Sequence, residues 1–155
     1  MPRRDSIHSV VRRALVKDGW DITDDPYVIS YGERFLFVDL AATKIGKPDT
    51  AQSQFIGAAK DDRQIAVEIK AFRGQSAIAD LEQDIGQYVL YRLLLRQIDP
   101  SRQVYLAVGN LDYDQIFSEP IGELVINKLP LNLIVINLES AEVQQWIPSR
   151  NKSLS

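Results

Sequence analysis

The stretch Gln64-Ile65-Ala66-Val67-Glu68-Ile69-Lys70-Ala71-Phe72 carries Glu68 and Lys70 inside a run of apolar residues. Side chains alternate along a β-strand, so the odd-numbered residues face one way, whereas Glu68 and Lys70 face the other. Apolar residues on both faces predict a central strand that is covered on each side. A buried Glu or Lys is costly unless it is paired or binds a metal. The stretch therefore predicts both the middle of a sheet and a candidate site.

A second acidic residue interrupts an apolar run earlier in the chain. Two strands are predicted at residues 27–31 and 34–42, and Gly32-Glu33 between them suits a two-residue hairpin loop. Asp39 stands near the end of the second strand, after Phe37-Val38. If this strand neighbours the strand at 64–72, the carboxylates of Asp39 and Glu68 lie side by side.

Apolar periodicity predicts two helices, at residues 6–17 and 76–96. In the longer helix the expected core stripe follows Ile78, Leu81 and Ile85, and continues through Tyr88 or Val89 to Arg92 or Leu93. The other expected elements are an extended piece at 20–23, a loop at 43–62, a strand at 103–108, a short helix at 113–117, a strand at 131–138 and a short element at 143–147.

This order predicts an α/β fold of the mixed α+β kind, with a central mixed β-sheet flanked by helices. Three strands precede the long helix as a meander, and a further strand follows the helical crossover. The 155 residues suit one domain, which we place at 1–148, with a flexible C-terminal tail at 149–155.

Composition excludes several classes of site. The chain has no cysteine, which excludes disulfides, thiolate zinc sites and cysteine nucleophiles. No apolar signal-peptide core follows the basic N-terminus, and no stretch approaches a membrane span, so we expect a cytoplasmic protein without a membrane partner. The net charge is −3, whereas a domain that holds DNA through general electrostatics is usually basic. DNA binding therefore needs a local basic patch or a partner.

Two adjacent carboxylates repel each other unless a proton or a cation intervenes. Mg²⁺ prefers oxygen ligands and commonly takes one or two carboxylates together with waters and phosphate. Asp39 and Glu68 are therefore candidate ligands for Mg²⁺ or Mn²⁺, and the backbone carbonyl of Ile69 is a candidate third ligand. Lys70 would orient the attacking water, lower its pKa or offset charge on the phosphate. The competing interpretation is a solvated strand face that carries a surface ion pair of little energetic value.

Gln87 and Tyr91 are four residues apart, so they share one face of the long helix, with Asp80 and Asp84 on the same mostly polar stripe. Gln87 can donate and accept hydrogen bonds, and the Tyr91 hydroxyl can bond a phosphate oxygen. Taken singly, Gln87 is an ordinary exposed polar residue and Tyr91 an aromatic at the edge of the core. Their position after the two acids and the lysine favours a role in the site.

Other polar residues carry weaker signals. His8, the sole histidine, has either a structural role near the start of the first helix or a supporting role at the carboxylates. Arg12, Arg13 and Lys17 either contact nucleic-acid phosphates or form the solvated face of an amphipathic helix. The apolar strand at 131–138 is either core or a sheet edge that pairs with another chain.

An Asp, then Glu-x-Lys, then Gln-x-x-x-Tyr on the following helix resembles the PD-(D/E)xK nuclease superfamily, especially its Gln-x-x-x-Tyr branch. The resemblance implies a restriction endonuclease-like core, metal binding by Asp39 and Glu68, and a catalytic role for Lys70, supported by Gln87 and Tyr91. This sequence departs from the pattern at Val38, where a proline usually precedes the first acid, and it has no acid in the middle of its first helix.

A closer resemblance, to the XisH family, covers nearly the whole chain. The matching blocks are His8, Ala14-Leu15-Val16-Lys17-Asp18-Gly19-Trp20, Asp25-Pro26, Phe37-Val38-Asp39-Leu40, Ile65-Ala66-Val67-Glu68-Ile69-Lys70, Asp80-Leu81-Glu82, Gly86-Gln87-Tyr88-Val89-Leu90-Tyr91-Arg92, Tyr105-Leu106-Ala107-Val108 and Gln145-Trp146-Ile147. The main departure is at residues 44–60. The resemblance implies a factor that controls excision of a DNA element interrupting a nitrogen-fixation gene, beside a site-specific recombinase and a small XisI-type partner.

Two functions follow from these observations. The first is a Mg²⁺-dependent endonuclease that hydrolyses DNA. The second is a catalytically inactive accessory protein on a nuclease fold, which binds the small partner or the recombinase; a homo-oligomer is compatible with both. An unrelated α/β domain with an incidental charge cluster is the third interpretation, and a structure with Asp39 and Glu68 far apart would favour it.

Overall fold

The computed structural model describes residues 3–44, 63–72 and 76–148, and the side chains from residue 7 onward within these ranges. The helices are α1 (Arg3–Lys17), α3 (Ala77–Ile98), α4 (Asn110–Asp112) and α5 (Pro120–Lys128), with a π-helical turn η1 (Tyr113–Phe117) between α4 and α5. The strands are β1 (Asp21–Asp24), β2 (Tyr27–Tyr31), β3 (Arg34–Val38), β4 (Leu40–Lys44), β5 (Arg63–Lys70), β6 (Arg102–Gly109), β7 (Leu133–Asn137) and β8 (Glu142–Ile147).

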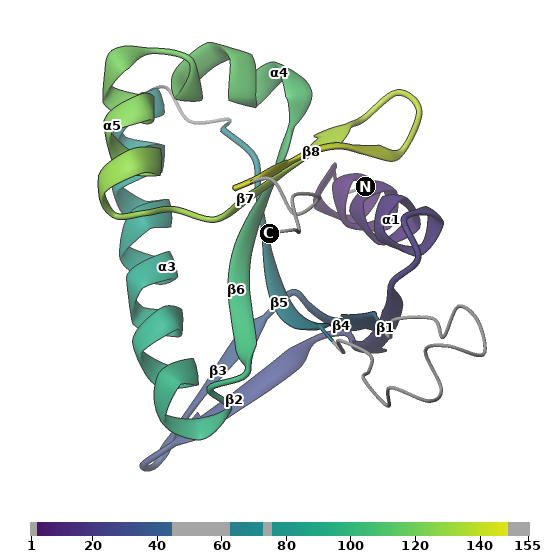
Figure 1. The fold of residues 1–155 in the computed structure, drawn as a ribbon, viewed down its shortest axis with the longest axis vertical. Helices are drawn as coiled ribbons and strands as arrows, with labels where there is room; N and C mark the ends of the chain where they lie inside the picture. Colours follow the sequence, from purple (N-terminus) through teal and green to yellow (C-terminus); the bar gives the residue numbers. More distant parts are fainter. Residues whose placement is uncertain (1–2, 45–62, 73–75, 149–155) are drawn as a thin grey trace, which may run out of the picture.

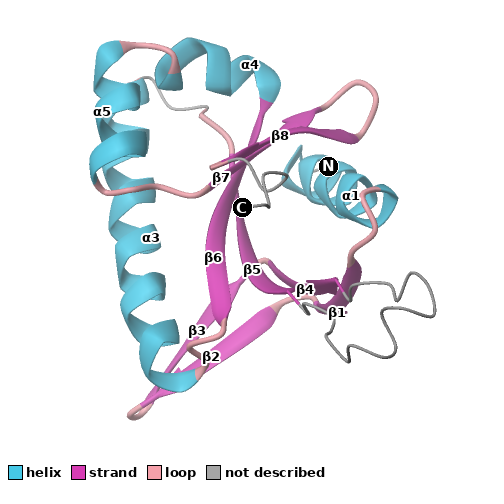
Figure 2. Ribbon diagram, in the orientation of Figure 1, coloured by secondary structure: helices cyan, strands magenta, loops and turns pink. Residues whose placement is uncertain are grey.

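The central sheet is mixed, as the sequence predicts. Its strand order is β1-β4-β5-β6-β7-β8, with β5, β6 and β7 parallel to one another and the outer pairs antiparallel. The parallel pair β5–β6 is joined by the crossover helix α3, whereas β2 and β3 form a separate two-stranded sheet. Figure 2 shows this hairpin projecting from one end of the central sheet.

The alternation of side chains on β5 divides the core between two faces of the sheet. Ala66 packs on one side with Leu81 and Tyr88 of α3. Ile65 and Val67 pack on the other side with the buried face of α1, which includes Val11 and Leu15. Figure 1 shows α3 and α1 on opposite sides of the sheet. Because α3 covers the face to which Glu68 points, any site built on that residue lies between β5 and α3.

The prediction of one continuous strand at 34–42 is wrong, because two strands occupy this stretch. The chain forms β3 up to Val38, leaves strand geometry at Asp39 and continues as β4 from Leu40. β3 pairs with β2, whereas β4 pairs with β1 and β5, so the chain changes sheets at Asp39. The predicted meander is therefore also wrong, because β2 belongs to the hairpin sheet. β4 pairs with β5, as the predicted site requires, and Leu40 lies opposite Val67.

The expected core stripe of the long helix is wrong in part. Leu81 and Tyr88 are buried, but Ile78 and Leu93 are 42% and 53% exposed. The buried face runs through Leu81, Asp84, Tyr88, Tyr91 and Leu95. This rotation brings Asp84 against the sheet, where the ammonium of Lys70 offsets its charge.

Three further differences concern the connections. Helix α5 is absent from the predicted elements, although Pro120 at its first turn is a helix-start signal. The short helix at 113–117 is a π-helical turn. In the predicted loop at 43–62, Thr43 and Lys44 belong to β4, and residues 45–62 lie outside the described residues, as does the predicted tail at 149–155.

In the described ranges, no helix has both the length and the apolarity to cross a membrane.

Candidate functional site

A pocket of about 520 Å³ opens between the end of β5, the first half of α3 and the start of α1. Its lining carries the acids Asp39, Glu68, Asp80 and Asp84, the base Lys70 and the imidazole of His8, and Gln83 and Gln87 add amide groups. Four carboxylates and one ammonium give this lining a formal charge of −3, leaving His8 aside. The structure therefore brings the predicted Asp39, Glu68, Lys70 and Gln87 to one cavity, and the predicted His8 lines it too.

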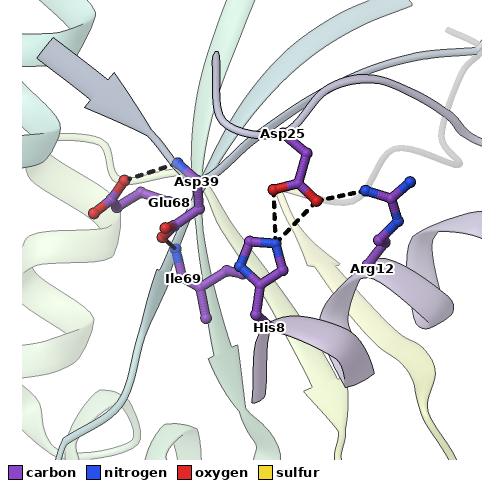
Figure 3. A network of polar contacts seen from close by, with 6 residues as sticks. All are labelled: His8, Arg12, Asp25, Asp39, Glu68 and Ile69. Carbon is purple, nitrogen blue, oxygen red and sulfur yellow. Dashed lines mark hydrogen bonds and ion pairs between the residues drawn. The ribbon is translucent and has the colours of Figure 1, made fainter. Parts of the chain in front are cut away.

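Two hydrogen bonds connect Asp39 to the end of β5, one to Glu68 and one to Ile69 (Figure 3). The backbone N–H of Asp39 donates to Glu68 Oε1 at 3.3 Å, and the backbone N–H of Ile69 donates to Asp39 Oδ2 at 2.8 Å. The first bond uses the N–H group of Asp39, the residue at which the chain leaves β3. The break in the strand therefore places Asp39 at the border of the two sheets, where its carboxylate is near enough to Glu68 to raise the pKa of that group.

Lys70 lies two residues beyond Glu68 on the same face of β5, and its ammonium contacts three acceptors. Lys70 Nζ is 3.3 Å from Glu68 Oε2 and 3.7 Å from Asp84 Oδ1, and it donates a short hydrogen bond to Gln87 Oε1. Glu68 and Asp84 are 7% and 6% exposed, so these ion pairs are largely removed from water. Burial makes the pairing necessary, because an isolated buried charge is strongly unfavourable.

The pKa values of the buried carboxyls are raised. Burial, followed by repulsion from the Asp39 carboxylate, raises the pKa of Glu68, and Lys70 offsets part of this effect. Burial also raises the pKa of Asp84 to about 6, again opposed by Lys70. Groups whose ionisation is disfavoured in this way gain most from a nearby cation. The pocket thus favours positive charge.

The donor set suits a hard divalent cation. Asp39, at the junction of β3 and β4, and Glu68, on β5, offer carboxylate oxygens, and the Ile69 N–H donates to Asp39. Within residues 3–44, 63–72 and 76–148, no group of three His, Asp or Glu side chains is arranged to hold a metal. Mg²⁺ does not require such a group, because it usually keeps several waters and binds through one or two carboxylates. Asp39 and Glu68 can hold it in that way.

Gln87 and Tyr91 occupy different positions relative to the pocket. Gln87 lines it and accepts the hydrogen bond from Lys70. Tyr91 is 5% exposed, and its hydroxyl donates to the backbone carbonyl of Phe37 at 3.4 Å. Burial raises the pKa of Tyr91 to about 12, with the nearby Glu68 and Asp39 charges adding to the effect. Tyr91 therefore contacts the end of β3, two residues before Asp39, and does not line the pocket.

His8 reaches the rim of the pocket from α1 and is held there by Asp25. Its Nε2 lies 2.9 Å and 3.1 Å from the two carboxylate oxygens of Asp25, and Arg12 donates to the same carboxylate. Figure 3 shows the imidazole between Asp25 and the Asp39–Ile69 pair. Asp25 thus fixes the orientation of the ring beside the carboxylates.

The predicted phosphate contacts on α1 lie outside the pocket. Arg12 is paired with Asp25, and Lys17 Nζ donates to the backbone carbonyl of Ser140 at 2.8 Å. Arg13 is exposed. Two of these three cations are therefore used for contacts within the protein.

Sequence reasoning missed the roles of Asp84 and Asp25. A signal for Asp84 is present, since it falls on the polar stripe with Gln87. The apolar residues alone, however, predict that a different face of the helix is buried. Asp25 precedes Pro26 and was interpreted as part of a turn. Its contact with His8 joins residues 17 positions apart, which no local pattern indicates.

Comparisons with known proteins agree with this fold. The model of the XisH protein family matches residues 1–144. The crystal structure of an XisH family protein from Nostoc punctiforme has a TM-score of 0.77 and 33% identity, covering 92% of this chain and 98% of that one. That of an FdxN element excision controlling factor protein from Anabaena variabilis has a TM-score of 0.75 and 37% identity, covering 93% and 99%. No curated protein matches this chain. With nine-tenths of its length matched by the family model, the chain belongs to the XisH family.

Proposed function

We propose that this protein hydrolyses phosphodiester bonds of DNA with Mg²⁺ or Mn²⁺ and acts in the excision of a DNA element. The observation that carries the proposal is the hydrogen-bonded pair of Asp39 and Glu68, with the Lys70 ammonium 3.3 Å from Glu68, in an open pocket. This arrangement is the one expected for a PD-(D/E)xK nuclease with a restriction endonuclease-like core. The name of the Anabaena variabilis relative, an excision controlling factor, supports the biological role.

The proposed roles follow from the positions of the side chains. Asp39 and Glu68 hold the cation, together with the Ile69 carbonyl. A bound Mg²⁺ supplies charge stabilisation at the phosphate and lowers the pKa of a bound water. Lys70 donates hydrogen bonds to the attacking water or to the phosphate, and Gln87 positions Lys70. The water oxygen forms a bond to phosphorus as the water gives up a proton, the bond to the leaving ester oxygen breaks, and the leaving oxygen gains a proton, so that water is added across the P–O bond. His8 supports the site from its rim.

Cation binding would make this acidic pocket compatible with a DNA substrate. Its formal charge of −3 repels phosphate, and cation binding at Asp39 and Glu68 reduces that charge. We expect Arg13, on the exposed face of α1, to add a phosphate contact that does not compete with an internal ion pair.

The test is titration of Mg²⁺ or Mn²⁺ into the wild type and Asp39→Ala, read by calorimetry with and without a short DNA duplex. We expect binding to the wild type only. Cleavage of the duplex is then compared between the wild type and Lys70→Ala, with an expected loss of at least about a hundredfold. Glu123→Ala, an exposed carboxylate on α5, is the control for nonspecific charge effects. Equal cleavage by Lys70→Ala would show the mechanism to be wrong.

A second candidate is an accessory factor that binds a small XisI-type partner protein or a site-specific recombinase. The outer face of the β2–β3 hairpin favours it. Val28, Phe35 and Phe37 lie on one side of this two-stranded sheet and are 46%, 65% and 59% exposed. An apolar cluster of this kind on a projecting element is typical of a protein-binding surface.

This candidate predicts that the hairpin carries the affinity for the small partner. Phe35→Ser with Phe37→Ser should weaken binding of an XisI-type protein by at least about a hundredfold in calorimetry. Leu93→Ser on the exposed face of α3 is the matched control. Strong binding by the double variant would exclude the hairpin as the interface, and robust metal-dependent cleavage by the wild type alone would count against a purely accessory role.

A further inference from the structure

The Lys70 ammonium both supports and obstructs a cation at Glu68. It has three N–H donors, and Glu68, Asp84 and Gln87 supply three acceptors. In this arrangement Lys70 donates to Gln87 and is paired with Glu68, while Asp84 lies at a longer distance. Its positive charge also lies 3.3 Å from Glu68 Oε2, which a cation would need. Cation binding therefore requires Lys70 to move away from Glu68 while it stays in the pocket.

Asp84 has the position and the free capacity to accept Lys70. It comes from α3, on the opposite side of the pocket from Glu68 on β5. Its Oδ1 lies 3.7 Å from Lys70 Nζ, which is within ion-pair range but longer than a hydrogen bond. Its Oδ2 is buried and takes no hydrogen bond within the described part of the chain. Such an unpaired buried oxygen destabilises the fold, so its retention at the pocket suggests a function.

We propose that Asp84 is a positioning residue for the cation site, which draws Lys70 off Glu68 when a divalent cation binds at Asp39 and Glu68. This inference rests on the proposed function. The cation repels the ammonium and neutralises Glu68, so Asp84 becomes the strongest acceptor within reach. Lys70 then stays beside Gln87 and has a donor free for the phosphate or the attacking water. Asp80, one turn away on α3, adds negative charge to the same side of the pocket.

The simpler explanation is that Asp84 attracts any cation through its own charge, without acting through Lys70. A double-mutant cycle on Mg²⁺ affinity separates the two, because it isolates the coupling between the two side chains. Asp84→Asn removes the charge while keeping the size, and Lys70→Met removes the ammonium. Calorimetric Mg²⁺ titrations of the wild type, the two single variants and the double variant complete the cycle. Glu82→Gln, an exposed charge change on the same helix, is the control.

We expect Asp84→Asn to weaken Mg²⁺ binding about tenfold when Lys70 is present, and to change it less than about threefold in the Lys70→Met background. Asp84→Glu, which retains the charge, should restore most of the affinity, and it also tests the proposal if the Asn variant does not fold. An equal loss in both backgrounds would overturn the inference, because Asp84 would then act by its own charge.

Failure of the inference is distinguishable from failure of the proposed function. If Mg²⁺ binds the wild type and Asp39→Ala equally, or binds neither, the cation site is absent and both proposals are wrong. If Asp39→Ala abolishes binding while Asp84→Asn binds as the wild type does, the cation site stands and the role of Asp84 is wrong.

Discussion

At the scale of single residues, the pocket holds carboxylates whose ionisation the fold disfavours. Glu68 and Asp84 are both buried, and burial is the largest cause of the raised pKa of each. The loss of stability is greatest for Asp84, because one of its carboxylate oxygens is buried without a described hydrogen bond. A side chain that lowers stability while lining a pocket is the pattern expected where function and stability compete.

The first prediction concerns the pH dependence of stability. The pKa of Asp84 is raised from 3.8 to about 6, so between these values the folded state binds more protons than the unfolded state. The contribution of Asp84 to the free energy of unfolding therefore falls as the pH rises from about 4 to about 6. Asp84→Asn removes this loss, and we expect it to be more stable than the wild type at pH 7.5 by up to about 2–3 kcal/mol. At pH 4 the two should be nearly equal.

Urea unfolding at pH 4 and pH 7.5 measures this difference, with Glu82→Gln as the control. A gain of equal size at both pH values would mean that the aspartate destabilises the fold for a reason other than its charge. The experiment is done without divalent cations, because a bound cation would stabilise the ionised form of the neighbouring Glu68.

Sequence patterns identify those site residues whose neighbours are local. Glu68 and Lys70 share a strand face because side chains alternate, and Gln87 follows on the next helix. Asp84 and Asp25 were missed because their roles depend on the rotation of α3 and on the contact between α1 and the turn before β2. Both depend on tertiary packing, which the hydrophobic periodicity of one segment does not determine.

At the scale of elements, the junction between two strands determines where the acid of the site lies. The break at Asp39 sends the chain from the hairpin sheet to the central sheet, and it brings the acid to β5. The apolar pattern indicates strand on both sides of Asp39, and it contains no Gly or Pro that would predict the break. Two helical glycines show a similar dependence on context, since one lies in open space and the other at a close contact.

The second prediction compares Gly86→Ala in α3 with Gly122→Ala in α5. A Cβ at Gly86 would have nothing within 4 Å, so alanine should stabilise the helix by about 0.5–1 kcal/mol. A Cβ at Gly122 would lie 2.3 Å from the carbonyl oxygen of Ile116 and 2.4 Å from Phe117 Cα. Alanine there must displace α5 from η1, and we expect a loss of at least about 2 kcal/mol.

Chemical denaturation of the two variants beside the wild type gives both values in one series. The opposite signs are the informative result, because helix propensity alone predicts stabilisation at both positions. Stabilisation by Gly122→Ala would show that α5 does not pack against the π-helical turn as closely as described.

At the scale of the whole molecule, the mixed sheet and its helical layers were predictable, because the long apolar strands and the crossover helix have strong patterns. The assignment of β2 and β3 to a separate sheet was not, since pairing partners depend on contacts distant in sequence. The charge of the protein likewise has one part that the sequence gives and one part that depends on the fold. A net charge of −3 is a property of the sequence, but the concentration of four carboxylates and one ammonium around one cavity is a property of the fold.

The third prediction links that cavity to the stability of the whole protein. A ligand that binds only the folded state stabilises it by about 2.7 kcal/mol at a concentration of 100 times its Kd. For a chain of 155 residues this corresponds to a rise in Tm of roughly 5–10 °C. We expect Mg²⁺ at that concentration to produce this rise in the wild type and none in Asp39→Asn, which keeps an oxygen to accept from the Ile69 N–H but lacks the charge. Thermal unfolding at constant ionic strength, with NaCl replacing MgCl₂ in the reference, separates site binding from general screening. An equal rise in both proteins would place the cation elsewhere and remove the basis for a nuclease centre at Asp39 and Glu68.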